Sequence, residues 1–599
     1  MSNPSYRPLT PAEIEQLERQ GNCAEDWSAL RVAEPFCPDY IRNSTFMGAV
    51  SLGSIESRRR TDGALALPEG IYGSTLADTT LGNHPTVHNV HMLSGYTIGD
   101  NALLFNIDEM TAAPDDPSWL EPMNENGGRR ILPFSGMTIG DAYLWARYRG
   151  RKTLMERLEQ YTRRLLATPE GRYGQLGDNC VVKNTKSLHN LVVRSTADDP
   201  SRIDSCIVLR DGVVGYGCTL EYGVIAERFL LGEHVHLEFG LRLNDTVVGD
   251  NSTLARCEVG NSIIFPAHEQ HHNNSFLIAG LIMGQSNIAA GGTIGSNHNS
   301  RTADNELAAG RGFWPGLCCS FKHSSRFASY CLLAKADYPS ELDITLPFAL
   351  VNNNLAKDQL EVMPAYWWMY NMYAMNRNSK KFAKRDKRKF KAQNIEFDNL
   401  APDTAEEMLR GMELLRQWIA ASTDGTVYAD GMEKGKRRTV ILKAKEGLQA
   451  YGDMLVYYAM KYLTAAGGDA LPSPTLAEGA RTKEWINLGG QLVAKADMEQ
   501  LIADVEKGTL GSWADINRRL DDLWQAYPAQ RDAHAYHVLC ALEGTDRLDN
   551  ACWQRLLDRY NAIQQYVDEQ IRLSRQKDEQ NPYRNMTYWD ADEAAAVLE

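Results

Sequence analysis

The histidines of this 599-residue chain are unevenly placed, and several could carry acid–base chemistry. Eleven of the 13 precede residue 324; among them are the adjacent pair His271 and His272, and His298 a little further on. Imidazole gains and loses a proton near neutral pH, so histidine is the usual general base for a hydroxyl or an amine. We expect His298 to be a catalytic base, with His271 and His272 as the other candidates. The competing interpretation is a histidine that only hydrogen-bonds at a turn.

The run around His298 contains only small and polar side chains, and it ends in a basic one. Asn297 and Asn299 flank the histidine, and Arg301 closes the run. An amide side chain both donates and accepts hydrogen bonds. We therefore expect the two asparagines to orient a substrate and Arg301 to help bind it.

A second polar strip follows between residues 310 and 326. It contains Arg311, Lys322, His323 and Arg326 among glycines and aromatic residues. Guanidinium and ammonium groups are the usual partners of phosphate. We expect these four residues to bind an anionic part of a substrate; the alternative is a loop whose aromatic side chains fill hydrophobic space.

Metal and nucleotide motifs are incomplete. The segment 268–272 matches H-E-x-x-H, but that zinc motif requires a helix and turn-forming residues surround it here. A weaker alternative is a zinc site at His84, His88 and His91, because imidazole binds that metal. The glycine-rich segment 431–436 lacks the length and the Ser/Thr of a phosphate-binding loop. We expect no metal and no tightly bound cofactor.

A repeated aliphatic–glycine pair indicates which elements position these residues. Val214, Leu231 and Val248 are 17 residues apart, and each precedes a glycine. The same pair occurs at Leu52, Leu81, Ile98, Ile139, Leu176, Val259 and Ile294, and a six-residue step joins Phe276, Ile282, Ile288 and Ile294. A step of six fits neither a helical face nor simple strand alternation. It is typical of a coil of three short strands, each of which points one aliphatic side chain inward.

On these pairs and hexads, the chain resembles the hexapeptide-repeat transferases over about residues 40–355, and its layout looks like that of a family of large bacterial hexapeptide-repeat proteins. The resemblance implies a left-handed parallel β-helix. It also implies acyl transfer from a coenzyme A-type thioester to a sugar or nucleotide-sugar. Members commonly form trimers, so a homo-oligomer is expected. The fifth place of the three preceding hexads holds a small residue: Gly280, Ser286 and Gly292. His298 takes the next of these places, so a bulky polar ring stands where the repeat otherwise has a small side chain.

The remaining patterns divide the chain into three parts. We expect an N-terminal helical cap over residues 1–39, the β-helix over 40–355 with a helical insertion at about 142–170, and an α-helical C-terminal domain over 356–599. A basic run at 377–391 has three interpretations: a solvated face, a phosphate-binding face, or a partner for acidic residues of the same chain.

Composition narrows the protein class. The formal charge is -14, which argues against general nucleic-acid binding, and no apolar run approaches the roughly 20 residues of a membrane helix. The N-terminus lacks the features of a secretory signal, and 11 cysteines without a C-x-x-C pair suggest reduced, buried thiols. We expect a cytoplasmic protein.

Together these features favour an acyltransferase-like enzyme that uses acyl-coenzyme A as a co-substrate. Backbone N–H groups at Gly291 and Gly292 are candidates for stabilising the oxyanion. The alternatives are a nucleotidyltransferase-like sugar-nucleotide protein and a non-catalytic β-helix that serves as a binding or assembly scaffold.

Overall fold

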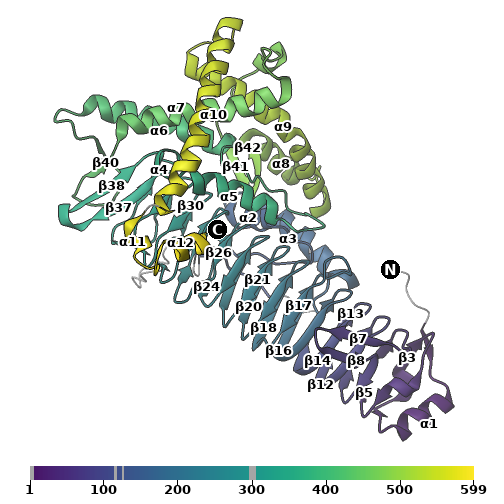
Figure 1. The fold of residues 1–599 in the computed structure, drawn as a ribbon. Helices are drawn as coiled ribbons and strands as arrows, with labels where there is room; N and C mark the ends of the chain where they lie inside the picture. The colour runs from purple at the N-terminus through teal and green to yellow at the C-terminus, as the bar shows by residue number, and fades with distance from the viewer. Residues whose placement is uncertain (1–5, 114–117, 125–126, 296–304, 580, 599) are drawn as a thin grey trace.

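A long parallel β-solenoid forms the N-terminal part of the chain and ends against a helical region (Figure 1). The computed structural model describes residues 6–113, 118–124, 127–295, 305–579 and 581–598. Successive coils pair as parallel strands, each covering the edge of the one before it. The predicted solenoid followed by helices is confirmed.

The repeated aliphatic residues form one column inside the solenoid. Val214 of β18 (Val208–Val214) pairs with Leu231 of β20 (Ile225–Leu231), which pairs with Val248 of β22 (Arg242–Val248). None of the three is more than 1% exposed. The same column runs back through Val193, Leu176, Ile98, Leu81 and Leu52.

Two assignments within the repeat are wrong. Ile139 does not belong to a coil; it begins the helix α2 (Ile139–Arg147), where the N-cap Thr138 and Asp141 form a capping box. Phe276 lies half-buried at the surface of β27 (Phe276–Ile278), whereas the interior residue is the fully buried Leu277. Side chains alternate along a strand, so a one-residue offset moves the inward position to the other face.

The solenoid is longer at its start than expected, and it carries two insertions. Pairing already begins at β2 (Cys23–Ala24), before residue 40, and the last solenoid strand is β37 (Leu350–Asn354). A hairpin of β7 (Arg59–Asp62) and β8 (Leu65–Pro68) leaves the early coils. The expected helical insertion is confirmed as α2 and α3 (Lys152–Leu166).

The C-terminal region packs helices on the end and flank of the solenoid (Figure 1). Its longer helices are α6 (Pro402–Ala421), α7 (Ala444–Gly467), α8 (Lys495–Lys507), α9 (Trp513–Glu543) and α10 (Asn550–Glu579). The region is not purely helical. It also contains β38 (Gln359–Met363), β39 (Tyr428–Ala429), β40 (Thr439–Ile441) and the hairpin of β41 (Trp485–Leu488) and β42 (Gln491–Ala494).

The second half of the basic run docks on acidic residues of the solenoid. Arg388 is buried, and it pairs with Asp250 at 2.9 Å and with Asp386 at 2.8 Å. The backbone N–H of Lys391 donates to a carboxylate oxygen of Glu233 at 3.0 Å. Of the three interpretations of this run, the contact with an acidic face of the same chain is therefore correct for this half.

Candidate functional site

One corner of the solenoid changes its residue type part-way along the stack of coils. Ser205, Tyr222, Phe239 and Arg256 follow one another at 17-residue steps, and each has φ between 52° and 59°. This left-handed conformation is uncommon for bulky residues and is tolerated best by glycine and asparagine. We call Tyr222, Phe239 and Arg256 the corner stack.

Earlier coils show what this corner normally holds. Asn89, Asn106 and Asn184 occupy it with φ of 54°, and their amides form a ladder. Asn89 donates to Asn106 at 2.9 Å, and Asn106 donates to Asn184 at 3.2 Å. Asparagine suits the left-handed backbone and uses its side chain locally, so the switch to aromatic residues needs another explanation.

The corner stack is ordered and half exposed. The Tyr222 and Phe239 rings lie 5.0 Å apart with an interplanar angle of 12°, and the Arg256 guanidinium lies 4.4 Å from the Phe239 ring centroid. Tyr222 is 52% exposed and Phe239 is 42% exposed. Little burial therefore compensates for their backbone strain.

The coil after the corner stack departs from the 17-residue step. Arg242 pairs with Glu258 after 16 residues, and Glu258 pairs with Phe276 after 18. The longer coil widens the corner at residues 271–275, where the chain passes from β26 (Glu269–Gln270) to β27. A cavity of about 420 Å³ lies at this corner. Its lining is Phe239, Gly240, Arg242, Arg256, Cys257, Glu258, Asn273, Asn274, Ser275, Phe276 and Thr293.

We call this cavity the flank cavity. Two exposed arginines, Arg242 and Arg256, give it a positive charge. Neither Arg242 nor Arg256 forms an ion pair with another residue that the structure describes, and Glu258 is the one described carboxylate in the lining. Arg256 donates to the backbone carbonyl of His271 at 3.5 Å. The cavity is therefore suited to an anionic group.

A histidine–carboxylate pair lies beside the cavity. Nδ1 of His271 is 3.2 Å from Oε2 of Glu269, and the other oxygen of Glu269 is 3.2 Å from Arg385. The His271 side chain is 39% exposed, and its ring centroid is 4.4 Å from that of His272. A carboxylate that binds one ring nitrogen orients the imidazole and leaves the other nitrogen for proton transfer.

His268 has a different role although it is close in sequence. It is fully buried, with Nδ1 2.8 Å from the Ser286 hydroxyl and Nε2 3.1 Å from the Gln270 side-chain oxygen. Burial lowers the pKa of His268 to about 4. The ring is therefore a neutral structural group at physiological pH. The zinc motif requires a helix, and the segment 268–272 is not helical.

Comparison with known proteins places the chain in a family. A family model described as a domain of unknown function, DUF4954, matches residues 6–418. The chain belongs to the DUF4954 family. A protein of Treponema pallidum (strain Nichols), titled "Uncharacterized protein", is 40% identical over 652 aligned residues, which cover 99% of this chain and 90% of that protein. The DUF4954 region contains the solenoid, the corner stack, the flank cavity and His271, and it ends within α6.

The lining of the cavity does not include the other predicted site residues that the structure describes, Arg311, Lys322, His323 and Arg326. Asn297, His298, Asn299 and Arg301 fall outside the described residues. Arg311 is not an open anion site. It is buried, and its Nε and Nη2 donate to the two carboxylate oxygens of Asp403 at 2.9 and 2.7 Å, while Nη1 donates to the backbone carbonyl of Asp398.

His323 is also inside the protein. Its two ring nitrogens contact the backbone carbonyl oxygens of Gly295 and Ile278. Lys322 pairs with Glu341 at 3.3 Å, and the exposed Arg326 pairs with Asp343 at 2.7 Å. The strip from 310 to 326 is therefore divided between buried contacts and surface ion pairs.

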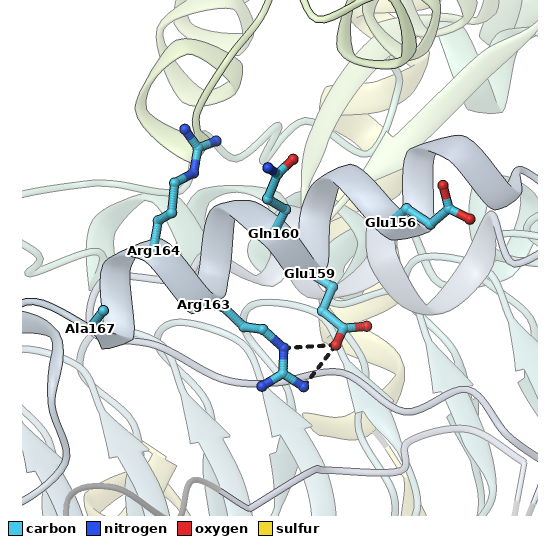
Figure 2. A pocket seen from close by; sticks show the side chains of 6 residues that line it. All are labelled: Glu156, Glu159, Gln160, Arg163, Arg164 and Ala167. Atoms are coloured by element: carbon cyan, nitrogen blue, oxygen red, sulfur yellow. Dashed lines mark hydrogen bonds and ion pairs between the residues drawn. The ribbon is translucent and has the colours of Figure 1, made fainter.

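A larger hollow of about 490 Å³ lies over α3 (Figure 2). Its lining comes from one exposed face of that helix: Glu156, Glu159, Gln160, Arg163, Arg164 and Ala167. Arg163 already pairs with Glu159 at 2.8 Å. A single helix face does not enclose a ligand, so the smaller flank cavity is the better site in this DUF4954 protein.

The part of the chain that the structure describes lacks both a metal-ligand cluster and a membrane-spanning helix. It contains no group of three or more His, Cys, Asp or Glu side chains placed to hold a metal ion. None of its helices combines the length and the hydropathy that crossing a bilayer requires.

Proposed function

We propose that the protein is an acyltransferase-like enzyme that moves an acyl group from a coenzyme A-type thioester to a sugar or nucleotide-sugar at the flank cavity. The observation that carries the proposal is the combination of Arg242 and Arg256 in one cavity with the His271–Glu269 pair beside it. The resemblance of the repeats to hexapeptide-repeat transferases supports the same reaction.

The arginines suit both reactants. Coenzyme A and nucleotide-sugars carry phosphates, and guanidinium groups bind phosphate through paired N–H donors. Both guanidiniums lack a carboxylate partner among the described residues, so binding a phosphate would not require an ion pair to break.

His271 is the proposed base. Its free ring nitrogen takes the proton of the acceptor hydroxyl or amine, and the acceptor atom attacks the thioester carbonyl. The tetrahedral intermediate collapses with cleavage of the C–S bond, and the coenzyme A thiolate leaves and takes up the proton. Glu269 holds the ring in position throughout. His298 stays the other predicted base.

The experiment is a transfer assay with acetyl-coenzyme A and a panel of sugars and nucleotide-sugars, read as release of free thiol. His271→Gln should lower turnover by roughly 10²–10⁴-fold, the usual contribution of a positioned general base. Wild-type protein that releases no thiol above background with any acceptor would remove the proposal and favour the scaffold alternative.

The chain offers a matched control. His91 also lies beside a carboxylate, Asp108 at 3.6 Å, but on an early coil far from the cavity. His91→Gln should keep wild-type turnover. Loss of turnover in His298→Ala with none in His271→Gln would transfer the role of the base to His298.

A further inference from the structure

We propose that the flank cavity binds a nucleoside phosphate whose base continues the corner stack of Tyr222, Phe239 and Arg256. The inference rests on the proposed function, because it names the chemical class of the ligand in the same cavity.

The first argument is the residue type at the corner. The preceding coils fill this position with asparagine or serine, and their amides bond along the column. Tyr222 and Phe239 are bulky residues in a backbone conformation that resists them, and they remain half exposed. Neither local geometry nor burial accounts for two aromatic rings here, whereas a stacking role does.

The second argument is the order of the stack. Tyr222, Phe239 and Arg256 occupy three successive coils, so Arg256 and Tyr222 lie on opposite sides of Phe239. The next coil carries the widened loop at residues 271–275 and returns to asparagine at this corner with Asn274, and both Arg256 and Asn274 line the cavity. A planar ring placed in the cavity would therefore stack on the guanidinium, as bases do on arginine in nucleic-acid complexes.

The third argument separates a base from a saturated sugar. Within the stack the aromatic rings face each other, so Phe239 has no free face for a sugar ring to cover. Arg242 lies in the same lining and can bind a phosphate, and Asn273 and Asn274 supply amide groups for the edge of a base. A planar base with a phosphate uses all of these groups.

The test is calorimetric titration of the full chain with each of the four nucleoside monophosphates, AMP, GMP, CMP and UMP. Ribose 5-phosphate and inorganic phosphate are the comparison ligands. Stacking tolerates any base, so at least one nucleotide should bind roughly ten-fold or more tightly than ribose 5-phosphate. Equal affinity for all four nucleotides and ribose 5-phosphate would overturn the inference.

Variants test whether the corner stack causes the preference for nucleotides over ribose 5-phosphate. Phe239→Asn restores the residue type of the earlier corners, so it keeps the fold while it removes the ring. Phe239 would act on the base through Arg256, because its ring supports the guanidinium on which the base stacks. The variant should therefore weaken the best nucleotide roughly 5-fold, as expected for the loss of one exposed cation–π contact, and leave the affinity for ribose 5-phosphate unchanged. Ser205→Asn, at the same corner but outside the stack, should change neither. Nucleotide affinity that is unchanged in Phe239→Asn would overturn the inference.

The binding measurements and the thiol-release assay can have different outcomes, so they test the two proposals separately. Stack-dependent nucleotide binding in a protein without thiol release would keep this inference and remove the transfer reaction. Thiol release that Phe239→Asn leaves intact, with no preference for nucleotides, would keep the proposed function and remove this inference.

Discussion

Burial changes the chemistry of single carboxyl groups beside the solenoid. Asp141 of α2 is fully buried, and it accepts a hydrogen bond from the backbone N–H of Thr138 at 2.9 Å. Burial raises the pKa of Asp141 to about 6, against the opposing effect of the hydrogen bonds from Thr138. The folded protein therefore holds a proton on Asp141 in a pH range where the unfolded chain has lost it.

This shift predicts a pH-dependent stability. Because the folded pKa is raised, the stabilisation is complete below the unfolded pKa of about 4 and is lost as the pH rises through about 6. Asp141→Asn has no such titration. From pH 4 to pH 8 the wild type should lose about 2.5 kcal/mol of unfolding free energy relative to this variant, measured by urea denaturation.

The control for this prediction is an exposed aspartate. Asp546 lies at the surface after α9, so Asp546→Asn should follow the wild type at every pH. A constant difference between wild type and Asp141→Asn across the pH range would contradict the prediction.

At the scale of elements, each solenoid strand is buried on both sides where the helices cover it. Val247 lies on a strand that contacts α2, in a core that includes Trp145 and Trp513, whereas its neighbour Val248 belongs to the solenoid core. The adjacent apolar pairs along these strands follow from this arrangement, because a sheet covered on both faces needs apolar residues on both.

The interior column predicts a severe effect of one charge. Val248→Asp places a carboxylate between Leu231 and Ile264, where no partner is available among the described residues. We expect a loss of roughly 4 kcal/mol or more in unfolding free energy, or failure to fold, measured by denaturation and by soluble yield. Thr219→Asp, at a half-exposed strand position, should cost less than about 1 kcal/mol; equal stability of the two variants would show that the column is not the core.

At the scale of the whole molecule, buried ion pairs join the solenoid to the C-terminal region. Arg311 binds Asp403 at the start of α6, and Arg388 binds Asp250 on the solenoid. A buried pair that loses one partner leaves an uncompensated charge. Deletion of the run 377–391 would therefore disturb the fold.

Assembly is the prediction at this scale. β-Helices of the resembled superfamily form trimers about an axis parallel to the helix, so we expect a homo-oligomer, with a trimer favoured. Multi-angle light scattering at micromolar concentration should return a multiple of the chain mass. A particle with the mass of a single chain would contradict this prediction.

The repeat made the solenoid predictable from sequence, because a 17-residue step with one buried aliphatic residue per strand is a strong, local signal. The same 17-residue step connects Ser205, Tyr222, Phe239 and Arg256, so the corner stack also leaves a signal in the sequence, outside the aliphatic columns. His271 can be proposed from the sequence because the acid–base chemistry of imidazole depends on residue type alone.

Only the tertiary structure decided which residues contact one another and how the coils of different length stack. A sequence of polar residues does not reveal that Arg311 is buried against Asp403, 92 residues away. The helix α9 continues through Pro528 although proline lacks a backbone N–H, because packing over a long helix can offset one missing backbone hydrogen bond. The cavity arises where a 16-residue coil meets an 18-residue coil, and its charge comes from arginines left without carboxylate partners among the described residues. Local repetition therefore determined the scaffold, whereas the site depends on departures from the repeat that take on meaning only when the coils are stacked.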